Sequence, residues 1–139
     1  MQSKEEHFQA VGDLAFKYLN NQRLFILKDE YFIEDKNGNI NGKALGYVLS
    51  FLDVFLLAKG LEIRDGEGKM ILLRLLARLF PAEAPRVAAL VLHLRGISDN
   101  DEIMNGMMVG GQDAVEFLRD NKIPVRWPTC FSAELADPQ

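Results

Sequence analysis

The sequence has few of the residues on which metal sites and disulfide scaffolds depend. It contains one cysteine, Cys130, and two histidines, His7 and His93, among 139 residues. A single cysteine cannot form an intrachain disulfide, and no two of these three residues have the spacing of a zinc site. We therefore expect no disulfide scaffold, no metal centre and no cofactor.

Long apolar runs are also missing. The longest run, residues 44–58, is interrupted by Ser50 and Asp53 and is shorter than the roughly 20 apolar residues that span a bilayer. Residues 1–7 are polar and acidic, without the apolar segment of a secretory signal. We therefore expect a soluble cytoplasmic protein that binds no membrane.

The charge is small and unevenly distributed. The net charge is −4; residues 62–97 carry six basic and four acidic side chains, and residues 98–139 carry three basic and eight acidic ones. This asymmetry could orient a partner, but it is weaker than the basic face of a nucleic-acid-binding protein. The expected partner is another protein or a second copy of the chain, and not a nucleic acid.

The apolar residues recur mainly at helical spacing, which predicts a mostly α, single compact domain of five or six helices. The composition, 48% hydrophobic and 26% charged, is that of an ordinary globular domain. The predicted helices cover residues 3–21, 42–60, 69–80 and 86–95, followed by a short helix that ends at Met107 and a last helix over residues 112–121.

A small antiparallel β-hairpin is predicted near residues 24–41, because two short aromatic and branched segments flank an Asn37-Gly38 turn. We place the whole domain at residues 1–121, with the hairpin as an insert. Residues 122–139 contain three prolines, which favour an extended tail packed on the same domain.

Glycines suggest two further features. Gly46 and Ser50, four residues apart on the most apolar predicted helix, would let a second helix, or a second copy of the chain, approach closely. Gly110-Gly111 predicts a sharp turn between two short helices, and an anion site at the following helix N-terminus is the weaker alternative.

The segment Asp35–Asn41 alternates oxygen-bearing side chains in the manner of a calcium loop. However, Ile40 stands where an EF-hand requires glycine and Gly46 where it requires glutamate. A tight turn explains the same residues, and the sequence leaves open whether the turn binds an ion.

Catalytic signatures are weak. A Cys130–His93 pair is conceivable, but Cys130 lies in a proline-flanked tail that is poorly suited to holding a nucleophile. An internal pocket is an alternative site; it would contain Tyr47, Ser50, Asp53 and His93. Asp53 would be its ionisable group, because an acid on an apolar helix can be buried with a shifted pKa.

Two groups of residues suit recognition instead. Methionines pack adaptably against varied partners, and Arg and Trp are common interface anchors. The candidates are Met104, Met107, Met108, Arg126, Trp127 and Phe131. The leading hypothesis is a small non-enzymatic interaction protein, such as an adaptor, a toxin-neutralising immunity protein or a regulator; the alternative is a small enzyme or ligand-binding domain. A tail held on its own core by Trp127 would explain the same tail residues without a partner.

Overall fold

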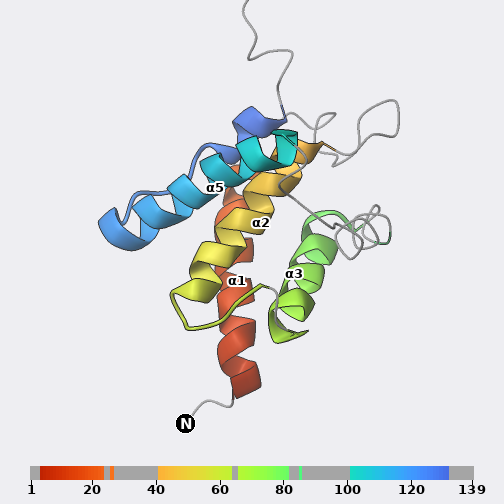
Figure 1. Cartoon of the computed structure of the whole chain (residues 1–139), viewed down its shortest axis with the longest axis vertical. Helices are drawn as coiled ribbons and strands as arrows, with labels where there is room; N and C mark the ends of the chain where they lie inside the picture. Colours follow the sequence, from red (N-terminus) through yellow and green to blue (C-terminus); the bar gives the residue numbers. More distant parts are fainter. Residues whose placement is uncertain are drawn as a thin grey trace, which may run out of the picture.

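A computed structural model of the chain describes residues 4–23, 26, 41–63, 66–81, 85 and 101–131. These residues form four α-helices and one short 3-10 helix, arranged as Figure 1 shows. The elements are α1 (Lys4–Gln22), α2 (Gly42–Leu57), α3 (Gly66–Leu79), α5 (Asp101–Asp120) and the 3-10 helix η4 (Trp127–Cys130).

The prediction of a mostly helical domain is confirmed for the part of the chain that the structure describes, in which no strand occurs. The predicted hairpin near residues 24–41 and the predicted helix over residues 86–95 lie almost entirely outside the described residues. Both therefore stay predictions, as does the count of five or six helices.

Helix α2 is the centre of the fold, as its apolar sequence predicted. Eleven of its residues are buried, and it contacts α1, α3, α5 and η4. Its N-terminus is capped by Asn41, whose side-chain oxygen accepts a hydrogen bond from the Ala44 amide at 3.1 Å. After its C-terminus, Gly60 adopts φ 76°, a left-handed conformation that ends helices and suits glycine. Within the described residues, no helix is long and apolar enough to cross a membrane.

Helix α5 corrects the predicted turn at Gly110-Gly111. The chain is helical without interruption from Asp101 to Asp120, so the two short helices predicted here are one long helix. Asp101 and Glu102 occupy its first turn, where the helix dipole favours acids. Because Gly110 and Gly111 lie in mid-helix, they do not form the N-terminal anion site that was the weaker alternative.

The glycines instead allow α2 and α5 to lie side by side, as Figure 1 shows. Three of them lie so close to a backbone carbonyl of the facing helix that a Cβ would overlap it. These pairs are Gly46 with Ile103, Gly106 with Lys43, and Gly110 with Tyr47. The predicted close approach at Gly46 and Ser50 is confirmed, and the approaching helix belongs to the same chain.

Helix α3 packs on the other side of the domain, against α1. It begins at Gly66, three residues before the predicted start, and its buried side is apolar; Arg74 and Arg78 of its polar stripe bond to α1. Arg78 forms an ion pair with Asp13 at 2.9 Å, and its guanidinium lies 3.8 Å from the centre of the Phe16 ring. These exposed contacts orient α3, but each contributes little to stability.

Gly106→Ala should lower the free energy of unfolding by about 2–3 kcal/mol, because the added methyl group must separate two packed helix backbones. Chemical denaturation monitored by circular dichroism measures this loss. Gly66→Ala is the matched control, since a Cβ there has no atom within 4 Å; it should leave stability unchanged or raise it slightly. Equal effects of the two substitutions would contradict the close backbone contact.

Candidate functional site

Asp113, on α5, is a buried carboxylate, and only 3% of its surface is exposed. The Tyr47 hydroxyl on α2 donates to its Oδ2 at 2.5 Å, and the backbone N–H of Arg126 donates to the same oxygen at 3.0 Å. The Arg126 guanidinium donates to Oδ1 and also to Glu116 at 2.6 Å. Asp113 therefore joins α2, α5 and the segment that follows α5.

Gln22, the last residue of α1, extends these bonds. Its Nε2 donates to the Tyr47 hydroxyl at 3.1 Å, and its Oε1 accepts the Trp127 backbone N–H at 2.8 Å. Both ends of this buried amide are satisfied, as buried polar groups require. We call Gln22, Tyr47, Asp113, Glu116 and Arg126 the Asp113 network.

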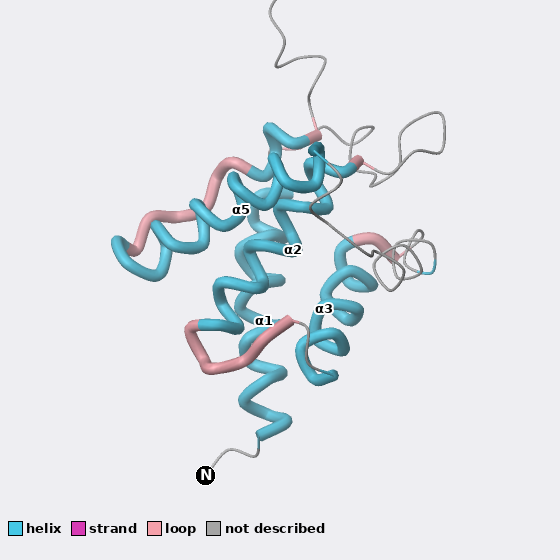
Figure 2. The backbone as a smooth tube through the Cα atoms, in the orientation of Figure 1, coloured by secondary structure: helices cyan, strands magenta, loops and turns pink. Residues whose placement is uncertain are grey.

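The segment after α5 turns back along that helix and leads into η4, as Figure 2 shows. Trp127 is completely buried at the start of η4, where its indole N–H donates to the Ala44 carbonyl at 3.2 Å. Phe131 is half-buried and packs edge-on against the Trp127 ring, with the centroids 5.1 Å apart. Residues 126–131 are thus held on the core, and residues 132–139 lie outside the described residues.

This placement bears on three of the predicted partner-binding residues. Trp127 lies inside the core, the Arg126 guanidinium is engaged by two carboxylates, and Phe131 is covered in part by Trp127. Whether these residues contact a partner stays a prediction. The contacts that the structure does give them are contacts within the chain.

The environment of the network shifts the pKa of several groups. Burial, together with the hydrogen bond to Asp113, raises the pKa of Tyr47 far above its ordinary value, so the phenol stays a donor. The hydrogen bond from Arg126 holds the pKa of Glu116 below its ordinary value. A lowered carboxyl pKa stabilises the folded chain at neutral pH, and this contribution is lost as the pH falls through the acid range.

Cys130, the single cysteine, closes η4 and is buried. Its backbone carbonyl accepts a hydrogen bond from the Asn41 side chain at 3.0 Å, so the residue that caps α2 also holds η4. Burial raises the pKa of the Cys130 thiol to about 11. A thiol in this environment is a poor nucleophile at neutral pH.

Three residues of the predicted internal pocket, Tyr47, Ser50 and Asp53, lie on α2. Tyr47 is completely buried, and its hydroxyl is engaged by Asp113 and Gln22. Ser50 and Asp53 are partly buried, and Ser50 lies against Gly111 of α5. His93 lies outside the described residues. The ligand-binding role of this set therefore stays a prediction.

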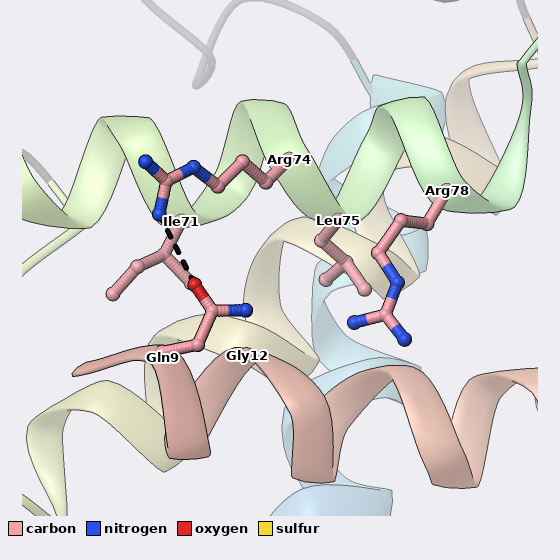
Figure 3. A pocket seen from close by; sticks show the side chains of 6 residues that line it. All are labelled: Gln9, Gly12, Ile71, Arg74, Leu75 and Arg78. Atoms are coloured by element: carbon pink, nitrogen blue, oxygen red, sulfur yellow. Dashed lines mark hydrogen bonds between the residues drawn. The ribbon is translucent and has the colours of Figure 1, made fainter. Parts of the chain in front are cut away.

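A hollow does occur between α1 and α3, and Figure 3 shows its lining. Gln9 on α1 accepts a hydrogen bond from Arg74 on α3 at 3.1 Å, which bridges it. The space fits roughly one water molecule, much less than a metabolite needs. Among the described residues, no group of three or more histidine, cysteine or acidic side chains could hold a metal ion.

The outer side of α5 has a different character. Met104, Met108, Val115 and Leu118 are exposed and fall along one side of the helix, away from the side that packs on α2. Met108 is the most exposed, at 72%. Of the three predicted recognition methionines, Met104 and Met108 lie on this surface, whereas Met107 is half-buried against the core.

Comparisons with known proteins add no family to these observations. No family model, no curated protein and no solved structure matches this chain.

Sequence reasoning missed Asp113, which is the buried carboxylate, and followed Asp53 instead. The signal that could have revealed the burial of Asp113 is the spacing of Gly106 and Gly110, which repeats the spacing of Gly42 and Gly46. Once α5 is taken as one helix, Asp113 falls on the same side as Gly106, and so on the side that faces α2.

Asp113→Asn should lower the free energy of unfolding by about 2 kcal/mol, because it removes the charge that Arg126 pairs with. Trp127 is the only tryptophan, so its fluorescence reports whether η4 stays on the core. The control is Asp120→Asn, which removes an exposed ion pair with Arg119 and should change stability by less than about 0.5 kcal/mol. Unchanged stability in Asp113→Asn would contradict the central place of this carboxylate.

The Cys130 thiol should react with a disulfide reagent at pH 8 at least about 100-fold more slowly in the folded chain than in denaturant, because an unfolded thiol has a pKa near 8.5. The release of the reagent's chromophore measures both rates. Thr129→Cys in a Cys130→Ser background places the thiol at an exposed position and should react quickly. Fast reaction of native Cys130 would show that η4 does not protect it.

Proposed function

We propose that this chain is a small non-enzymatic protein-interaction domain of the adaptor, immunity or regulatory type. The surface proposed to bind its partner is the α5 outer face, defined as Met104, Met108, Val115 and Leu118. The observation that carries this proposal is the exposure of four large apolar side chains along one side of a single helix.

The spacing of these residues supports a docking function. They follow one another at intervals of four, seven and three residues, which places them on one side of an α-helix, as in helix–helix contacts. Single exposed apolar residues are common on protein surfaces, but a continuous row of them is typical of an interaction site. Two of the four are methionines, whose flexible side chains adapt to a partner.

The arrangement of the titratable groups also favours binding over catalysis. The Asp113 carboxylate, the most deeply buried acid among the described residues, is surrounded by donors from its own chain. The Tyr47 phenol and the Cys130 thiol are both held protonated by burial. A cytoplasmic location is part of the same proposal. The tail residues Arg126 and Phe131 flank η4 and would contribute to partner binding only from there.

Capture of partners from the native lysate tests the proposal, with the tagged chain as bait and mass spectrometry as readout. Met108→Glu should abolish capture of a stoichiometric partner, because it places a charge in the centre of an apolar contact. Met70→Glu is the matched control, since Met70 is also an exposed methionine but lies on α3, and it should capture the partner normally.

Both variants should unfold at the temperature of the parent chain, because both positions face solvent. A partner that binds Met108→Glu as well as the parent chain would overturn the α5 outer face as the binding surface.

A further inference from the structure

We propose that the α5 outer face binds the same face of a second copy of this chain, with the two α5 helices antiparallel. This inference rests on the proposed function and names the partner. Three features of the face support it: its symmetry about Gly111, the charges beside it, and its length.

The apolar residues of the α5 outer face are arranged almost symmetrically along the helix. Two large apolar residues precede Gly111 and two follow it: Met104 and Leu118 each lie seven residues from it, and Met108 and Val115 lie three and four residues from it. In an antiparallel pair with its two-fold axis near Gly111, Met104 faces Leu118 of the second copy and Met108 faces Val115. Such a self-complementary surface is what a two-fold dimer requires.

Gly111 lies between the two halves of the face, but it faces α2 of its own chain. It has no side chain, and a Cβ there would lie 2.8 Å from the Ser50 hydroxyl oxygen. The four large side chains on either side of it therefore supply the apolar contact between the two copies.

The charges beside the face select the antiparallel orientation. Asp101 and Arg119 are 18 residues apart, which is five turns of α-helix, so both lie in line along the same edge of the face. Antiparallel packing places Asp101 of each copy opposite Arg119 of the other, whereas parallel packing places these two residues at opposite ends of the pair. Arg119 is available for this exchange, since its ion pair with Asp120 is exposed to solvent.

The helix dipoles favour the same orientation, because antiparallel packing places the N-terminus of one α5 beside the C-terminus of the other. The apolar row is about 21 Å long, at 1.5 Å per residue. A contact of this length is smaller than a standard stable interface, so we expect a weak dimer whose population depends on concentration.

Sedimentation equilibrium of the full chain, from 10 µM to 1 mM, tests the inference. The average mass should rise from 15.7 kDa toward twice that value. Met108→Glu should weaken dimerisation by at least about 10-fold, whereas Met70→Glu should leave it unchanged. Thermal unfolding of each variant separates loss of dimerisation from loss of the fold.

Charge reversal tests the orientation. Asp101→Arg and Arg119→Asp should each weaken the dimer, and the double variant should restore it, because the exchanged charges again face each other. Single variants that dimerise as tightly as the parent chain, or a double variant weaker than both, would overturn the antiparallel register.

The outcomes distinguish this inference from the proposed function. A chain that stays monomeric at 1 mM, yet captures another protein through Met108, overturns self-association and leaves the interaction function intact. If Met108→Glu changes neither the average mass in sedimentation equilibrium nor the capture of other proteins, both self-association and the α5 outer face as a binding surface are overturned.

Discussion

The contact between the backbones of α2 and α5 is the constraint on which the rest of the structure depends. Because Gly46, Gly106 and Gly110 have no side chains, the two helices approach until each glycine touches a carbonyl of the other helix. This approach brings the Tyr47 hydroxyl within hydrogen-bonding distance of Asp113. It also leaves the opposite side of α5 without a covering helix among the described elements, so the same contact that builds the core exposes the apolar row.

The buried carboxylate shows why this arrangement is specific. A buried charge without partners would destabilise the fold by several kcal/mol. Asp113 has three donors, and hydrogen bonds to a charged group contribute about 1.5–3 kcal/mol each. The favourable contribution therefore requires α2, α5 and residues 126–127 to be in place together. A shift of α5 by one residue along α2 would separate Asp113 from Tyr47, so the network permits one register.

Local patterns predicted the helices α1, α2 and α3 and the close approach at Gly46, because apolar periodicity and glycine spacing are properties of short segments. The continuity of α5 was not predictable in this way. Gly110-Gly111 favours a turn when taken alone, and only the facing carbonyl of Tyr47 explains a glycine there in mid-helix. The burial of Asp113 depends in turn on that continuity. The sequence indicated Trp127 as an anchor. Its ring packs against the rings of Tyr47 and Phe80, which accounts for its burial in its own chain.

The double role of Asn41 has a consequence for the order in which the chain folds. Its side chain caps α2 and also holds the Cys130 carbonyl, 89 residues further along. Gln22 likewise meets Trp127 across 105 residues. A nascent chain that has emerged only as far as α5 therefore lacks the two Arg126 donors for Asp113 and the Trp127 ring that packs beside Tyr47. Such contacts between distant residues slow folding, and the domain can complete its core only after η4 has left the ribosome.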